Sequence, residues 1–190
     1  MKTRKSVFLL IIYFFTFFVC RIAYSEDSDW KAIQGRYFTV LLAPGVDAKY
    51  IYRNIRASSY EGFIFGGLFS GSSEYSDEAL AAEFDKMFVK VEKVLDMYPQ
   101  EVNINIKIYK THAQLSENLK NIGGRKNHDG RLLSYYIDIY KTIYTSKENI
   151  SRKVIAHEIG HVISERYFYA KVPNQIQELL AQYAEIHIDD

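Results

Sequence analysis

The sequence predicts an α+β fold in which a small mixed sheet packs against several helices. The first observation is an alternation of apolar and polar residues over 102–108, the period of a strand that buries one face. The second is an apolar stripe at intervals of three and four over 76–98, the period of an amphipathic helix. The third is the order of the runs, because strands and helices do not alternate strictly as they would in a doubly wound sheet.

The first 25 residues are predicted to be a signal peptide. A basic start is followed by an apolar run over 7–20, too short to span a bilayer comfortably, and by small residues at Ala23 and Ser25. Cleavage is expected after Ser25, which leaves one domain over 26–190 in a secreted or periplasmic location. An uncleaved membrane anchor is the alternative. A lipoprotein is disfavoured, because bulky residues precede Cys20 where small ones are needed.

The composition of the chain excludes several classes of protein. Its 190 residues suffice for one domain with a hydrophobic core. Cys20 is the only cysteine and lies in the predicted signal, so the mature domain has neither disulfides nor thiol chemistry. Residues 26–190 hold 20 basic and 23 acidic residues, a net charge of −3. Nucleic-acid binding, which normally needs a basic surface, is therefore not expected.

The first part of the domain predicts one strand and two helices. Residues 37–42 are aromatic and β-branched, and a Pro-Gly pair stops this strand. Asp47 can cap a short helix. Residues 60–73 are both glycine-rich and aromatic, which fits a mobile flap or hairpin as well as a buried irregular loop. The longest helix is predicted over Ser76–Tyr98, where Pro99 ends it.

The second part predicts three short strands and three helices. After the strand at 102–108, a capping-box pattern at Thr111 opens a helix through Leu119, and two strands follow within 132–145. The next helix is expected to begin at Asn149 or Ser151 and to end near Tyr167. Pro173 then marks the start of the last helix, Asn174–Ile188.

The first of these two last helices carries a His-Glu-x-x-His motif. His157 and His161 are four residues apart, so on a helix they share one face and can bind the same metal ion. Glu158 follows the first histidine and is expected to stand beside the metal, where a general base is needed.

A catalytic zinc site needs a third protein ligand and leaves one position open for water. A third histidine of the metzincin kind would require Gly at position 164 and His at 167, but the chain has Ser164 and Tyr167. A carboxylate on the following helix is the other common arrangement, and Glu178 is well placed for it. Glu185 and His187, further along the same helix, are weaker candidates.

These residues resemble the motifs of gluzincin zinc metallopeptidases, most similarly those of small secreted peptidase MA-like proteins and minigluzincins. The second motif of that group often reads Pro-x-Trp-x-x-Glu-Gly-x-Ala-x-Tyr. Here the glutamate, alanine and tyrosine are Glu178, Ala181 and Tyr183, whereas the Trp is absent and Leu179 replaces the Gly. The specific likeness is confined to about residues 154–183.

The resemblance implies a zincin-like fold and a zinc-dependent peptidase. One Zn²⁺ per chain would be bound by His157, His161 and Glu178, with Glu158 as the general base. An extended substrate would pair with an edge strand at Leu132–Asp138. The candidates for the oxyanion donor are Tyr135, Tyr136, Tyr183 and His112.

The remaining expectations concern partners and alternatives. The partner is a peptide or protein substrate, with no nucleic acid and no stable membrane association after signal cleavage. One alternative is a catalytically inactive binding module on the same fold; a weaker one is a structural protein without metal. Some polar residues are expected to play no part in the chemistry: Glu165 and Glu185 as solvated helix charges, Asp138 on the polar face of a strand, and His112 and His128 as ordinary helix and loop residues.

Overall fold

The structure is a computed structural model that describes residues 29–56, 75–122 and 133–190. The predicted signal peptide, the glycine-rich segment at 60–73 and His128 lie outside these residues. Among the described helices, none combines the length and the apolar character that a membrane span requires.

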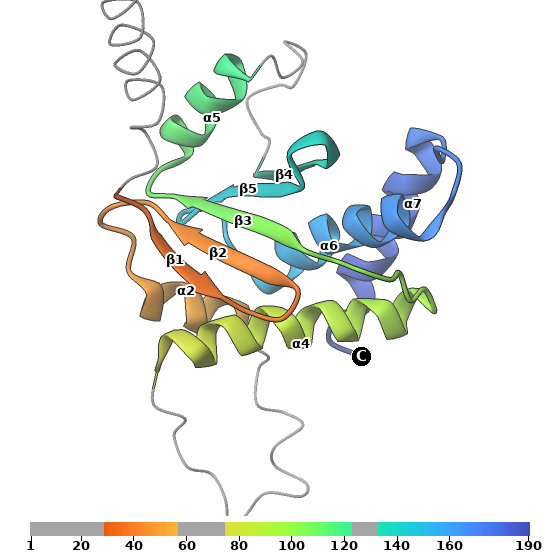
Figure 1. Ribbon diagram of the computed structural model, residues 1–190, viewed down its shortest axis with the longest axis horizontal. Coiled ribbons are helices and arrows are strands. Elements are labelled where there is room, and N and C mark those ends of the chain that lie inside the picture. The colour runs from red at the N-terminus through yellow and green to blue at the C-terminus, as the bar shows by residue number, and fades with distance from the viewer. Residues whose placement is uncertain (1–28, 57–74, 123–132) are drawn as a thin grey trace, which may run out of the picture. The chain divides into compact units, whose positions relative to one another are not determined.

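The fold is α+β, as predicted, with a five-stranded mixed sheet and, in the described part of the chain, five α-helices (Figure 1). The strands are β1 (Lys31–Gln34), β2 (Phe38–Leu42), β3 (Ile104–Tyr109), β4 (Ser134–Ile137) and β5 (Thr142–Ser146). Their order in the sheet is β1-β2-β3-β5-β4. The central pairs β2/β3 and β3/β5 are parallel, whereas β1 and β4 run antiparallel to their neighbours. Consequently β4 lies at one edge of the sheet.

The helices begin where the sequence predicts them. They are α2 (Ala48–Ile55), α4 (Asp77–Leu95), α5 (His112–Asn121), α6 (Arg152–Tyr167) and α7 (Asn174–His187), and a 3₁₀ turn, η1 (Asp138–Tyr140), joins β4 to β5. Four of the helices have a side-chain oxygen at the N-cap that accepts a hydrogen bond from a main-chain N–H of the first turn. These caps are Asp47, Ser76, Thr111 and Ser151.

Two details differ from the prediction. The helix predicted over Ser76–Tyr98 ends at Leu95, because Asp96 turns into the left-handed conformation, and Tyr98 is 56% exposed instead of packed in the core. The strand β1 was not predicted. It has only four residues, at the sheet edge opposite β4, and Ile33 is its one buried side chain, so it shows no alternating pattern.

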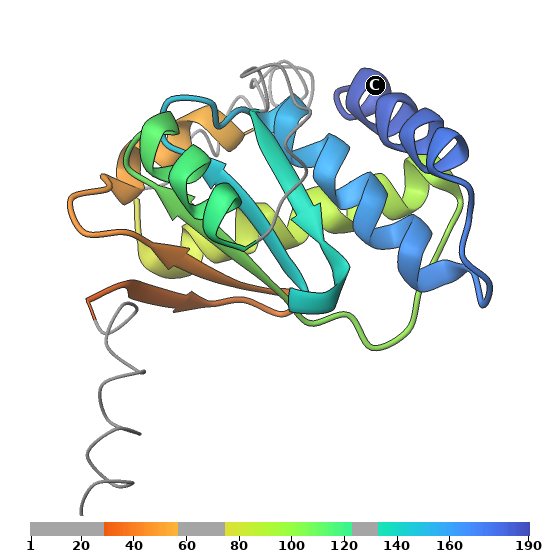
Figure 2. The same cartoon turned by 90° about the horizontal axis from the view of Figure 1, so that it is seen from above.

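The hydrophobic core lies between one face of the sheet and the helices α2, α4 and α6, while α5 lies on the other face (Figures 1 and 2). Alternate residues of the central strands supply the sheet side of this core, including Val40, Ile106 and Ile143, each fully buried. Phe38 packs edge-on against Phe84 and Phe88 of α4. Core packing therefore holds one side of α6 against the sheet, and α7 packs against another side of α6.

Helices α6 and α7 approach each other unusually closely. A Cβ atom added at Gly160 would lie 2.7 Å from the Cα of Ala181, which is shorter than any normal contact. Nearby, Gln177 of α7 donates a hydrogen bond to the Glu165 carboxylate of α6, so Glu165 is not simply a solvated charge. The atom that the added Cβ at Gly160 would meet, the Cα of Ala181, belongs to the backbone, so no side-chain rotation could relieve the contact. The tight packing is made by Gly160, while Leu179, which replaces the glycine of the second motif, is 61% exposed.

We predict that Gly160→Ala lowers the free energy of unfolding. At an exposed position inside a helix, Ala is more favourable than Gly by about 1 kcal/mol. At position 160 the added methyl group must instead separate two helices, which costs roughly 1–3 kcal/mol. Urea unfolding followed by circular dichroism measures the difference, and Lys153→Ala at an exposed position of α6 is the control. A Gly160→Ala protein at least as stable as the wild type would contradict the described packing.

Candidate metal centre

His157 and His161 lie side by side on α6, as their spacing predicts. Their ring centroids are 5.0 Å apart, and each side chain is 21% exposed. The helix that carries them begins at the Ser151 cap and packs Ile155 and Ile159 into the core. The buried face of α6 thus fixes the helix on the sheet, and the two imidazoles point toward α7.

Glu178 of α7 completes a group that can hold a metal ion. Its Oε1 lies 3.6 Å from His157 Nε2, and its Oε2 lies 3.6 Å from His161 Nε2. One ligand atom from each of the three residues lies within 4.8 Å of the others. Two atoms bound tetrahedrally to one zinc ion are about 3.4 Å apart. The donors and their spacing therefore fit zinc with only small side-chain adjustments.

The carboxylate of Glu178 is held by its surroundings. Gln182, one turn further along α7, donates a hydrogen bond to Glu178 Oε1 at 3.1 Å. The close contact between Gly160 and Ala181 lies within one turn of both His161 and Glu178 in their helices. The packing of the two helices therefore sets the distance between the histidines and the glutamate.

Glu185 contacts His157, contrary to the expectation that it is a solvated helix charge. Its Oε2 lies 3.0 Å from His157 Nδ1. A carboxylate there accepts a hydrogen bond from Nδ1–H, and in this tautomer Nε2 is unprotonated and faces Glu178. Carboxylates commonly orient metal-binding histidines in this way. The seven-residue spacing from Glu178, two helical turns, places both glutamates on one face of α7 and could have indicated this role.

The electrostatic environment keeps His161 neutral. Burial, together with the nearby His157, lowers the pKa of His161 to about 4, although the Glu178 carboxylate opposes this shift. At neutral pH the ring therefore carries a free nitrogen lone pair, the form that binds metals.

Glu158 is buried beside this group and contacts the edge strand. Its side chain is within hydrogen-bonding reach of the Ser134 hydroxyl and of the main-chain N–H of Tyr136, both in β4. Burial, with the charges of Glu178 and Glu185, raises the pKa of Glu158 to about 8, and the polar groups of Ser134 and Tyr136 limit the rise. The Ser134 hydroxyl also donates to the main-chain oxygen of Tyr144 at 3.0 Å. A cation bound by the neighbouring group would favour the ionised carboxylate.

A second set of contacts fastens β4 to α6. Arg166, in the last turn of α6, lies 2.8 Å from the Asp138 carboxylate and 3.4 Å from the Tyr136 hydroxyl. Tyr136 also donates to Asp138 at 3.0 Å. Asp138 therefore does not lie on the polar face of a strand, as predicted, but begins the turn η1 and pairs with an arginine. The edge strand lies along α6 on the side away from α7 (Figure 2).

The contacts of the four candidate oxyanion donors are with residues other than the three metal ligands. His112 Nδ1 and Nε2 lie near Asn149 and Ser116, at 2.9 and 3.2 Å, away from α6. The Tyr183 ring packs on His187, a weaker ligand candidate, which itself pairs with Asp190. Tyr135 stacks on Tyr144 with its hydroxyl buried. Among the described residues, Tyr136 contacts Glu158, but through its main chain.

Comparisons of the chain with protein-family models, with curated proteins and with solved structures found no match. Three features of the structure indicate a metal site: the two histidines and one glutamate, the 3.6 Å contacts among them, and the carboxylate that contacts His157 Nδ1.

We predict that Glu185→Ala weakens zinc binding by about 10- to 100-fold, because His157 loses the acceptor that orients its ring. Glu185→Gln should weaken zinc binding less, since the amide oxygen can still accept a hydrogen bond from Nδ1–H of His157. Zinc affinity is measured by competition with a chromophoric chelator. Glu117→Gln, at an exposed position of α5, is the control, and equal affinity of Glu185→Ala and this control would rule out the orienting role.

Proposed function

We propose that the protein is a zinc-dependent peptidase of the gluzincin type, with one Zn²⁺ held by His157, His161 and Glu178. The observation that carries this proposal is the buried carboxyl group of Glu158 beside a His-His-Glu group with the spacing of a zinc site. A structural zinc site normally has four protein ligands, whereas this group offers three and leaves room for water.

The chain's own residues have distinct parts in the reaction. When bound, zinc lowers the pKa of water and polarises a substrate carbonyl. Glu158 accepts the proton of the attacking water and passes it to the leaving amine. The N–H of Tyr136 orients the Glu158 carboxylate, and Glu185 orients His157.

The edge strand is the proposed support for the substrate. A peptide in extended conformation can pair with the main chain of an edge strand, here β4. The link from Arg166 to Tyr136 and Asp138 holds β4 against α6 and so fixes the strand beside Glu158. The substrate is a peptide or protein, with no part for nucleic acid. We propose a secreted or periplasmic location, without stable membrane association once the signal is removed.

We predict that Glu158→Gln lowers peptide hydrolysis by about 10²- to 10⁴-fold, the usual contribution of a general base, while zinc content stays at the wild-type level. A peptide library incubated with the zinc-loaded protein and analysed by mass spectrometry gives the rate. Addition of a chelator should abolish cleavage, and Glu117→Gln is the matched control.

Two results would contradict the proposal in different ways. A Glu158→Gln protein as active as the wild type would exclude Glu158 as the base. If the zinc-loaded wild-type protein cleaves no member of the library, the inactive binding module is the better description.

A further inference from the structure

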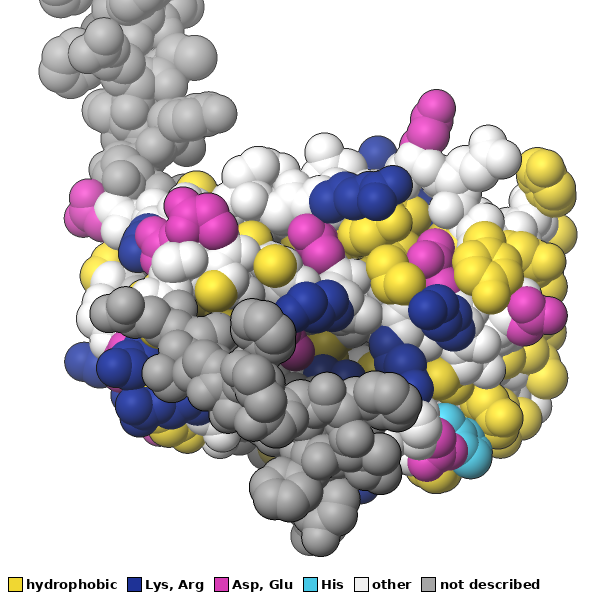
Figure 3. All heavy atoms as spheres, turned by 90° about the horizontal axis from the view of Figure 1, so that it is seen from below, with side chains coloured by type: hydrophobic (Ala, Val, Ile, Leu, Met, Phe, Trp, Pro, Cys, Tyr) yellow, Lys and Arg dark blue, Asp and Glu magenta, His cyan; other side chains and the backbone are white. Residues whose placement is uncertain are grey.

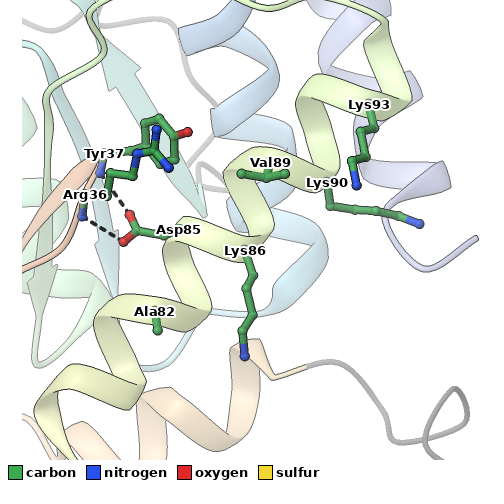
Figure 4. A pocket seen from close by; sticks show the side chains of 8 residues that line it. All are labelled: Arg36, Tyr37, Ala82, Asp85, Lys86, Val89, Lys90 and Lys93. Carbon is green, nitrogen blue, oxygen red and sulfur yellow. Dashed lines mark hydrogen bonds between the residues drawn. The ribbon is translucent and has the colours of Figure 1, made fainter. Parts of the chain in front are cut away.

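A basic groove runs along the outer side of α4, and none of its lining residues belongs to the metal centre. It has a volume of about 450 Å³ and lies between α4 and the turn that joins β1 to β2 (Figure 4). The lining residues are Arg36, Tyr37, Ala82, Asp85, Lys86, Val89, Lys90 and Lys93. Four of these eight are cations and one is an anion, although residues 26–190 as a whole carry a net charge of −3.

The positive charge follows from the spacing of the lysines. Lys86, Lys90 and Lys93 are four and three residues apart, so all three project from one side of α4 over about 10 Å of helix. Lys86 is 73% exposed, and Lys93 is exposed as well. Lys and Arg side chains also recur across the face of the molecule seen from below (Figure 3).

The groove is preformed by the fold. The Asp85 carboxylate accepts hydrogen bonds from the main-chain N–H groups of Arg36 and Tyr37, at 2.7 and 2.9 Å. Gly35 permits this approach, since a Cβ there would lie 3.0 Å from the same carboxylate. The Tyr37 ring stacks on Phe88 of the core, with the ring centroids 4.4 Å apart. The Arg36 guanidinium lies over the Tyr37 ring, 5.1 Å from its centroid. A ligand would meet a fixed wall and pay little for ordering it.

The neighbouring acidic groups are already engaged. Asp85 is bound to main-chain N–H groups, and Glu83 is buried next to Arg152 as well as 3.3 Å from Lys86. Glu92 is buried, which raises its pKa. Lys90 donates to the main-chain oxygen of Asp190. Lys86 is itself paired with Glu83, so the positive charge of the groove comes mainly from Arg36 and Lys93, with a smaller share from Lys86 and Lys90.

We propose that this groove binds an acidic peptide segment in extended conformation. The cations at its rim suit carboxylate side chains, and the apolar surfaces of Tyr37, Ala82 and Val89 suit alternate apolar side chains of the same segment. A concave, partly apolar groove favours a narrow chain over a flat membrane of anionic lipids, which would contact only the protruding lysines. This binding does not depend on the metal centre.

The experiment measures binding of a fluorescein-labelled peptide of alternating Glu and Leu residues by fluorescence anisotropy, with a chelator present. The triple variant Lys86→Gln, Lys90→Gln and Lys93→Gln should bind at least tenfold more weakly than the wild type. The control variant Lys110→Gln, Lys120→Gln and Lys171→Gln removes the same charge from exposed positions elsewhere and should stay within twofold. Wild-type affinity should fall steeply with added salt.

Three results would overturn the proposal. The first is equal weakening by both triple variants, which would reduce the effect to net charge. The second is equal binding of a peptide with Gln in place of Glu. The third is binding to phosphatidylglycerol vesicles without binding to the peptide, which would make the face a lipid surface. If the groove variant does not fold, Lys93→Glu alone should weaken peptide binding at least fivefold, and unchanged binding would also overturn the proposal.

Discussion

The close approach of α6 and α7 is the constraint on which the metal centre depends. Gly160 lies between the two histidines of the same helix, at the point where the backbone of Ala181 comes nearest. Any side chain at position 160 would push α7 outward and carry Glu178 and Glu185 with it. The sheet holds α6 through its buried apolar residues, and the missing Cβ lets α7 bring both carboxylates to the imidazoles.

The charges gathered there form the second constraint. Glu178 and Glu185 contact the two imidazoles, and burial, together with the charges of these two carboxylates, raises the pKa of Glu158. Like charges held close together are unfavourable unless a cation offsets them. A bound metal ion would stabilise the ionised form of all three, so its binding should also favour the folded packing of α6 and α7.

The sequence predicted those features that depend on neighbouring residues and missed those made by distant ones. The caps at Asp47 and Thr111, the alternation at 102–108 and the histidine spacing are local patterns, and the structure agrees with them. The strand β1, the contact of Glu185 with His157 and the fit of Gly160 against Ala181 arise only when separate elements meet. Helix α4 ended early because Asp96 adopted a left-handed conformation, which the apolar stripe could not indicate.

The most direct test of this account is the metal content of the purified protein, measured by inductively coupled plasma mass spectrometry after incubation with zinc and removal of the excess. The account predicts one zinc ion per wild-type chain and none retained in a variant that combines His161→Ala with Glu178→Ala. A wild-type protein that holds no zinc, or a double variant that holds as much as the wild type, would contradict it.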